Sequence, residues 1–488
     1  MTTFLAHDPR SAAAIGEYTD SSPDDVRAAT AAGAEAFAAI RHGTRAERAG
    51  WLHAIADAFD AAPAELLEIA DRETALGAAR LTGEWGRTRA QVRAFAALLA
   101  DDAFLEPIHD AADADAVPPR GDLHKILVPI GPVANFAASN FPFAFSVPGG
   151  DTVAALAAGC PVVVKAHPAH PGTSRRCAAL IADALVRAGA PAGTFAMLEG
   201  AGVDVGRALV LAPEIAAVAF TGSRRGGRAL YDLAATREVP IPVYAEMGSV
   251  NPVFVTDAAL AARGDAIADG FVASMLNGTG QFCTSPGVVV VPAGAPGDAF
   301  VARVVAAVDA APPGVMLNGQ IRDGLAAQRA STEKLNGVDV LAQGALADSG
   351  FAIAATVLAT DTATFIATDA LRDEHFGPVA IVVRGAVDEM PAIARAIDGS
   401  LTGTIHAEDA EASRAPVLRL RDALVERVGR LVWNGFPTGV AIAPAMHHGG
   451  PYPAATHSGF TSVGQHAVRR FLRPVTFQDV PAAALPVS

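Results

Sequence analysis

Residues 162–164 read Val-Val-Val, residues 195–198 read Phe-Ala-Met-Leu and residues 218–220 read Val-Ala-Phe. These short apolar runs have the length and composition of buried β-strands, and helix-like stretches separate them. Strands that alternate with helices indicate consecutive parallel βα units, with a sheet covered on both faces. The segment from Gly131 to Gly248 therefore predicts an α/β fold of the kind that binds dinucleotides.

One of these helices lies between the first two strands. Apolar residues at positions 180, 181, 184 and 185 recur at helical spacing. Thr173 or Ser174 is expected to cap its beginning, because a hydroxyl there can accept a hydrogen bond from the first turn. Gly189 followed by Pro191 predicts its end.

The flanking sequence predicts further elements. From Pro23 to about Leu99 the apolar residues recur at helical spacing, and the acidic stretch 101–125 with Pro118-Pro119 ends that pattern before a strand at 126–128. A second α/β portion follows, with helix-like runs at 271–276 and 298–310 and a strand at 288–291. At 488 residues the chain is too long for one hydrophobic core.

The composition excludes some classes of protein. Hydrophobic residues make up 51% and charged residues 18%, which indicates a globular protein rather than a disordered one. A net charge of −14 disfavours nucleic acid as a partner. The most apolar stretch, 133–164, carries Asn, Asp, Pro and Gly, so we expect no membrane span.

The cysteine count and the N-terminus predict the compartment. Three cysteines, at positions 160, 177 and 283, form neither a disulfide framework nor a thiolate-rich metal site. The N-terminus has neither the basic segment nor the apolar run of a secretory signal. We therefore expect a cytoplasmic protein.

Three polar side chains stand where chemistry could occur. Cys283 lies in a glycine-bearing loop between a predicted helix and strand, where a thiolate could attack a carbonyl carbon, whereas Cys160 and Cys177 have the apolar surroundings of buried residues. Glu246 ends an apolar strand, and desolvation there could hold it near working pH as a base. The amide of Asn140 could donate to an oxyanion. Each residue also has a plain structural interpretation: a buried thiol, a strand-end acid and a turn-forming Asn.

Taken together and in order, these segments resemble the aldehyde dehydrogenase superfamily over nearly the whole chain. The matching segments are Asn140-Phe141-Pro142, Val162-Val163-Val164-Lys165, Phe220-Thr221-Gly222-Ser223, Glu246-Met247-Gly248, Gly280-Gln281-Phe282-Cys283 and Glu374-His375-Phe376-Gly377-Pro378. The resemblance implies that Cys283 adds to an aldehyde to give a thiohemiacetal, with Asn140 stabilising the oxyanion. Hydride transfer then leaves a thioester, which Glu246 hydrolyses by activating water.

The resemblance also implies a nicotinamide coenzyme, NAD or NADP. A strict G-x-G-x-x-G motif is absent, but Thr221, Gly222 and Ser223 are expected at the helix start that meets the pyrophosphate. Lys165 is expected at the adenosine ribose, Glu374 at the nicotinamide ribose and Phe376 near the nicotinamide.

One departure from the family pattern concerns the choice between NAD and NADP. NAD-preferring relatives carry Glu three residues after the strand-end Lys, where this chain has Pro168. Without that carboxylate nothing repels a 2′-phosphate, so NADP is favoured, with Lys165 and His167 as candidate phosphate contacts.

Within the superfamily the sequence looks like the α-ketoglutaric semialdehyde (2,5-dioxopentanoate) dehydrogenases. Such a substrate needs a cation for its carboxylate, and Arg87, Arg89 and Arg93 are candidates, although an Arg is expected where Trp85 stands. A long-chain or aromatic aldehyde, or esterase or acyltransferase chemistry without nicotinamide, is the alternative. His448 is a candidate accessory residue for a proton path, and no metal site is predicted.

The resemblance implies three structural parts. A Rossmann-type cofactor domain comprises residues 1–111 and 131–247, and an α/β catalytic domain comprises residues 248–465. A bridging β element comprises residues 112–130 and 466–488. Its exposed strands predict a homodimer or homotetramer, with a small aldehyde as the other partner.

Overall fold

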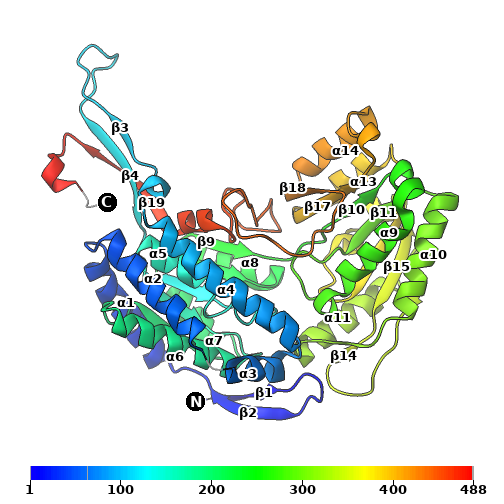
Figure 1. The fold of residues 1–488 in the computed structure, drawn as a ribbon, viewed down its shortest axis with the longest axis horizontal. Coiled ribbons are helices and arrows are strands. Elements are labelled where there is room, and N and C mark those ends of the chain that lie inside the picture. The colour runs from blue at the N-terminus through cyan, green and yellow to red at the C-terminus, as the bar shows by residue number, and fades with distance from the viewer. Residues whose placement is uncertain (1, 63, 486–488) are drawn as a thin grey trace.

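The structure, a computed structural model, describes residues 2–62 and 64–485. Residues 1, 63 and 486–488, which belong to segments of the predicted cofactor domain and bridging element, lie outside this description. Two α/β portions lie side by side, and a narrow arm extends from the first (Figure 1). No helix in the described part of the chain is long and apolar enough to cross a membrane.

The first portion is built on a five-stranded parallel sheet with strand order β7-β6-β5-β8-β9. Its strands are β5 (Val133–Phe136), β6 (Val162–Lys165), β7 (Phe195–Leu198), β8 (Ala217–Thr221) and β9 (Val243–Glu246). Its helices are α1 (Pro23–Ile40), α2 (Arg45–Asp60), α3 (Glu65–Thr74), α4 (Ala78–Leu98), α5 (Gly150–Ala158), α6 (Pro171–Arg187), α7 (Asp204–Leu211) and α8 (Arg224–Ala235). The strands predicted at 162–164, 195–198 and 218–220 therefore coincide with β6, β7 and β8.

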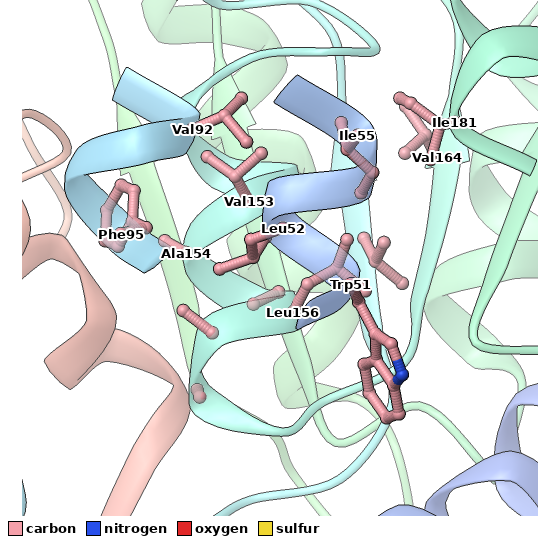
Figure 2. Packing of buried hydrophobic residues seen from close by; sticks show 14 of the residues in the cluster. Trp51, Leu52, Ile55, Val92, Phe95, Val153, Ala154, Leu156, Val164 and Ile181 are labelled. Carbon is pink, nitrogen blue, oxygen red and sulfur yellow. The ribbon is translucent and has the colours of Figure 1, made fainter. Parts of the chain in front are cut away.

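The two faces of this sheet bury two separate cores. Val162 and Val164 of β6 join the core formed with α2, α4, α5 and α6, part of which Figure 2 shows around Leu52. Val163, which points the other way, joins the core formed with α1, α7 and α8. Successive side chains of a strand point to opposite faces of the sheet, and both faces are buried here. The strand is therefore apolar at each of positions 162–164.

The start of α6 differs from the sequence expectation. The helix begins at Pro171, so Thr173 and Ser174 lie inside its first turn rather than at the cap. The buried Glu73, one hundred residues earlier, accepts hydrogen bonds from the backbone N–H of Gly172 at 2.7 Å and of Thr173 at 2.8 Å. A carboxylate from α3 therefore satisfies the donors that a local hydroxyl was expected to satisfy.

The second portion is built on a seven-stranded sheet with strand order β13-β15-β16-β11-β10-β17-β18, parallel except for β13. Its strands are β10 (Val253–Val255), β11 (Val288–Val291), β13 (Asp339–Gln343), β15 (Thr356–Asp361), β16 (Val379–Arg384), β17 (Ser400–His406) and β18 (Val428–Trp433). Its helices are α9 (Asp257–Leu276), α10 (Ala295–Asp309), α11 (Gly319–Thr332), α12 (Thr362–Ala367), α13 (Met390–Ala396) and α14 (Ala415–Val425). The elements expected at 271–276 and 288–291 fall within α9 and β11, and the helix expected at 298–310 is α10, which begins three residues earlier and ends one residue earlier.

The arm is a three-stranded antiparallel sheet with strand order β19-β4-β3. It joins β3 (Ile108–Asp110) and β4 (Leu123–Pro129) to β19 (Leu472–Gln478), so an internal segment pairs with the C-terminal segment (Figure 1). The short 3-10 turn η5 (Gln465–Phe471) ties it to the body through Arg470, which donates to Asp151 at 2.6 Å, both side chains being buried. Two small two-stranded sheets complete the fold: the hairpin of β1 (Thr3–His7) with β2 (Ala14–Thr19), and β12 (Gly314–Val315) with β14 (Ala352–Ile353).

Candidate active site

The loop that carries Cys283 connects α9 to β11 through three consecutive left-handed residues. Gly278, Thr279 and Gly280 have φ angles of 56°, 58° and 65° within the short turn η2 (Asn277–Gly280). A side chain at Gly280 would meet the carbonyl oxygen of Gly377 at 2.2 Å. Glycine at this position therefore allows the loop to lie against the segment that follows Glu374.

A single buried asparagine fixes the other side of this loop. Asn251 has a left-handed backbone (φ 47°), and its amide donates to the carbonyl oxygens of Cys283 at 2.8 Å and Ser285 at 2.9 Å. Sequence reasoning missed this role, although an Asn shortly after Glu246-Met247-Gly248 was a visible signal. Asn251 links the connection that follows Glu246 to the loop that carries the thiol.

Three side chains from distant parts of the chain converge beside this loop. Cys283 Sγ lies 3.4 Å from His448 Nε2, which lies 3.5 Å from Glu246 Oε2. Asn140 Nδ2 donates to the carbonyl oxygen of Gln281 at 3.0 Å, which places this amide next to Cys283 in the loop. The structure thus brings together Cys283, Glu246 and Asn140, and it puts His448 between the thiol and the carboxylate.

Burial dominates the electrostatics of these groups. It raises the pKa of the Cys283 thiol to about 12, with Glu246 and Glu374 adding to the effect. Burial raises the pKa of Glu246 to about 8, against smaller lowering effects of Ser462 and Arg470. The pKa of His448 falls to about 3, first through burial and then through Arg430 and Arg87. Among the three, Glu246 is therefore the group that changes its charge nearest neutral pH.

A cavity of about 740 Å³ opens beside the thiol, within the size range of ligand pockets. Its lining includes nine of the residues predicted from the sequence: Asn140, His167, Thr221, Gly222, Ser223, Glu246, Cys283, Glu374 and Phe376. Ser223 caps α8 by accepting from the backbone N–H of Gly226, so this helix begins at the cavity wall. The residues present therefore fit a dinucleotide whose pyrophosphate meets the start of α8.

Two of the predicted coenzyme residues have environments that the sequence did not reveal. Lys165 is outside the cavity lining, and its ammonium group donates to the carbonyl oxygen of Gly200. Its pKa is lowered to about 8 by burial. His167 lines the cavity, but burial holds its pKa well below the ordinary value, so its ring is neutral. Only Lys165 of this pair can carry positive charge.

The arginines of α4 have different partners. Arg89 and Arg93 pair with Asp60 near the surface. Arg87 lies over the ring of Phe145, at 5.2 Å from its centroid. Trp85, where an arginine was expected, is buried in the core against Phe59 and Phe143.

Arg80, which sequence reasoning missed, lies over Phe141 and Phe282 and donates to the carbonyl oxygen of Asn140 at 2.7 Å. It therefore holds the backbone next to the amide that faces the Cys283 loop. The sequence did offer a signal, because Arg80 stands one helical turn before Glu84 and two turns before Arg87, which puts the three side chains on one face of the helix.

A second cluster of polar side chains lies on the arm. The imidazoles of His109 and His124 stack at 4.0 Å, and each has Nε2 2.8 Å from an oxygen of Asp122. These three groups lie close enough together for metal ligands, and the sequence had not suggested them. Each imidazole already has Asp122 as its partner.

A thiol close to a buried carboxylate, at the edge of a cleft bounded by a doubly covered parallel sheet, fits the class of nicotinamide-dependent oxidoreductases. The model of the aldehyde dehydrogenase family matches residues 2–475, and the chain belongs to that family. It is an aldehyde-oxidising enzyme, and the family uses NAD or NADP as oxidant.

Three similar proteins illustrate the relationship. The chain is 46% identical to an alpha-ketoglutaric semialdehyde dehydrogenase 2 of Azospirillum brasilense over 95% of this chain and 88% of that one. It is 41% identical to an alpha-ketoglutaric semialdehyde dehydrogenase of Acinetobacter baylyi, over 96% and 89%. A glyceraldehyde-3-phosphate dehydrogenase of Methanocaldococcus jannaschii, solved with NADP, shares the fold, with a TM-score of 0.82 at 19% identity over 97% and 98%.

Proposed function

We propose that the enzyme oxidises 2,5-dioxopentanoate to 2-oxoglutarate, with Cys283 as the nucleophile. The observation that carries the proposal is the Cys283–His448–Glu246 array in a chain whose relatives, at 46% and 41% identity, bear the name of this activity. The thiol sulfur adds to the aldehyde carbon, and the Asn140 amide with the Cys283 N–H stabilises the oxyanion. A nicotinamide coenzyme, when bound in the cavity, would supply the hydride acceptor, and loss of that hydride would leave the acyl group on Cys283 as a thioester.

The proton of the thiol needs an acceptor, because a thiol with a pKa of about 12 does not ionise alone at neutral pH. His448 has a pKa of about 3 and Glu246 of about 8, so Glu246 holds the proton more strongly. His448 Nε2 stands between the two groups, at 3.4 Å and 3.5 Å. We infer that the proton passes by way of His448 to Glu246 in those enzyme molecules in which Glu246 is ionised, and that His448 acts as the accessory residue.

Deacylation uses the same carboxylate. After Glu246 has released its proton to solvent, it takes a proton from water. The hydroxyl adds to the thioester carbon, and the carbon–sulfur bond breaks. The carboxylic acid leaves, and the sulfur regains a proton. One buried carboxylate thus serves both halves of the reaction.

NADP is the proposed preferred coenzyme, with NAD also accepted. Pro168 leaves the position near the adenosine ribose without a carboxylate. Lys165 then supplies the charge for a 2′-phosphate, while the neutral His167 can only offer a hydrogen bond. Thr221, Gly222 and Ser223 would hold the pyrophosphate, Glu374 the nicotinamide ribose, and Phe376 would pack near the nicotinamide.

A substrate panel tests the activity. We expect purified enzyme to reduce NADP with 2,5-dioxopentanoate at a higher kcat/KM than with succinate semialdehyde, benzaldehyde or long-chain aldehydes. A preference for long-chain or aromatic aldehydes would contradict the substrate proposal. Ester hydrolysis without any coenzyme reduction would favour the hydrolase alternative.

The assembly and the three-part division are proposals as well. Strand β18 ends the large sheet and β19 ends the arm sheet, so each has an edge without a strand partner in the described chain. Such edges favour pairing between copies, which supports a homodimer or homotetramer. Light scattering after size exclusion would distinguish these from a monomer. The division at residues 111, 130, 247 and 465 has the support that the chain forms two large sheets and an arm sheet, but the arm sheet also includes β3, which lies before the first of these boundaries. Unpaired cysteines support a cytoplasmic location.

A further inference from the structure

The arm carries a compact group of two histidines and one aspartate, His109, Asp122 and His124, which we call the arm triad. His109 on β3 and His124 on β4 are paired directly across the antiparallel ladder. Asp122 stands two residues before His124, so the three side chains share one face of the arm. Each can offer a ligand atom, and these three atoms all lie within 4.8 Å of one another.

The two imidazoles point toward the same carboxylate. Their rings stack with centroids 4.0 Å apart and planes only 10° from parallel. His109 Nε2 lies 2.8 Å from Oδ1 of Asp122, and His124 Nε2 lies 2.8 Å from Oδ2. Two nitrogens and a carboxylate, contributed by β3 and by the start of β4, therefore converge on one small region of the surface.

The end of the arm sheet holds the carboxylate in this position. The backbone N–H of Asp122 donates to a carboxylate oxygen of Asp479 at 2.9 Å, and the carbonyl oxygen of Asp122 accepts from the N–H of Asp479 at 2.8 Å. The residue just after β19 thus fixes the backbone of Asp122, which lies between the two histidines. Because a ligand that is already in place loses less freedom on binding, this arrangement favours the capture of an ion.

Strand β3 has little else to hold it. All three of its residues are exposed, and its ladder with β4 is three residue pairs long. A short strand that buries no apolar surface adds little stability by itself. A bond between β3 and β4 through His109 would therefore stabilise the arm where hydrophobic packing does not.

We propose that the arm triad binds one divalent transition-metal ion of the Zn²⁺ type, through Nε2 of both histidines and one oxygen of Asp122. Imidazole and carboxylate are common ligands of Zn²⁺, whereas Mg²⁺ and Ca²⁺ prefer sites made of oxygen. Tetrahedral bonds of about 2.1 Å place ligand atoms about 3.4 Å apart, so the two 2.8 Å pairs need to open by only about 0.6 Å.

The ion replaces the hydrogen on each Nε2, each neutral ring keeps its proton on Nδ1, and water fills the fourth position. All three side chains are partly exposed, so an ion can reach them from solvent.

The ion acts as a structural metal, because it ties β3 to β4 and, through the backbone of Asp122, to the end of β19. None of the three described residues of the triad lines the cavity beside Cys283. The proposal therefore concerns the arm and does not depend on the substrate. The sequence did not indicate this site, because only the pairing of β3 with β4 brings His109 next to Asp122 and His124.

Calorimetry with Zn²⁺ on the full-length enzyme tests the site. The Cys283→Ala background removes the catalytic thiol as a competing ligand, and we expect one Zn²⁺ per chain. Adding His109→Gln or Asp122→Asn should weaken binding by at least about tenfold, since each change removes a ligand. The matched control His53→Gln removes an exposed histidine on α2 and should leave the affinity unchanged.

Amide hydrogen exchange shows whether the ion orders the arm. With free Zn²⁺ at about 100 times its Kd, exchange within 108–110 and 123–129 should slow by up to about 100-fold, and His109→Gln should abolish this protection. Each variant is compared with itself with and without the ion, so a change in its own stability does not enter the result. Mg²⁺ at the same concentration should give no protection.

Three outcomes would overturn the proposal. The first is Zn²⁺ binding that is equally strong in the His109→Gln and His53→Gln variants, which would indicate adventitious surface binding. The second is an arm whose amide exchange does not respond to Zn²⁺. The third is equal protection by Mg²⁺, which would contradict the choice of a transition metal.

Discussion

Replacing Glu246 by Gln should make the protein more stable and the enzyme nearly inactive. The carboxyl is 6% exposed, and burial raises its pKa from 4.5 to about 8. Below pH 4.5 the carboxyl is protonated in both the folded and the unfolded chain, so its shifted pKa does not change the free energy of unfolding. As pH rises toward 8 the unfolded chain ionises first, and stability is progressively lost.

The size of the effect follows from the shift. At pH 7 the folded carboxyl keeps a proton that the unfolded chain has released, and at 1.36 kcal/mol for each pH unit the cost is about 3 kcal/mol. Above pH 8 the cost reaches a plateau of about 5 kcal/mol. Gln has nearly the same shape and cannot ionise, so Glu246→Gln should regain most of this free energy at pH 8.5 and almost none at pH 4.5.

Thermal unfolding of both proteins between pH 4.5 and 8.5 measures the difference. The gap in Tm between variant and wild type should widen by several degrees as pH rises, whereas Glu238→Gln, at an exposed position before the same strand, should show no widening. In stopped flow, the variant should reduce coenzyme more slowly in its first turnover and also turn over slowly in the steady state, because Glu246 accepts the thiol proton before acylation and activates water after it. The wild-type deacylation rate should increase about tenfold from pH 6 to 7. A Tm gap independent of pH would refute the reasoning.

Three further predictions concern other residues. Cys283→Ala should abolish dehydrogenase turnover and leave no acyl adduct by mass spectrometry; activity like that of the wild type would rule out this nucleophile. Arg470→Met should destabilise the fold by about 3–5 kcal/mol, because it leaves Asp151 buried without a partner; adding Asp151→Asn should restore part of the stability in denaturant unfolding, and no recovery would argue against the pair. Pro168→Glu should shift the kcat/KM ratio at least about tenfold toward NAD, through repulsion of the 2′-phosphate; an unchanged ratio would place the phosphate elsewhere.

Much of the sheet architecture could be predicted from the sequence because local patterns determine it. The runs at 162–164 and 195–198 are short, apolar and bounded by turn residues, and they fall in β6 and β7. The hairpin of β1 and β2 was missed, since its strands are only partly buried and show no strong periodicity. The start of α6 was misplaced because its capping carboxylate, Glu73, is one hundred residues away.

The candidate site could be predicted in its parts and not in its geometry. Motifs identified Cys283 and Glu246, and desolvation of a strand-end acid was a reasonable expectation. No local pattern, however, reveals that His448 stands between them, because 165 residues separate it from the thiol. The same holds for Arg87, whose difference from Arg89 depends on where Asp60 lies in the folded chain.

The position of Glu73 at the beginning of α6 affects where an anion can bind at this sheet. Helices α6 and α8 follow β6 and β8, which flank β5 in one parallel sheet, so both helices begin at the carboxyl edge of that sheet, where the first amide groups of a helix can bind a phosphate. The carboxylate of Glu73 already accepts hydrogen bonds from the first amide groups of α6, whereas it does not contact those of α8. Of these two helix starts, that of α8 lines the cavity beside Cys283, and that of α6 does not.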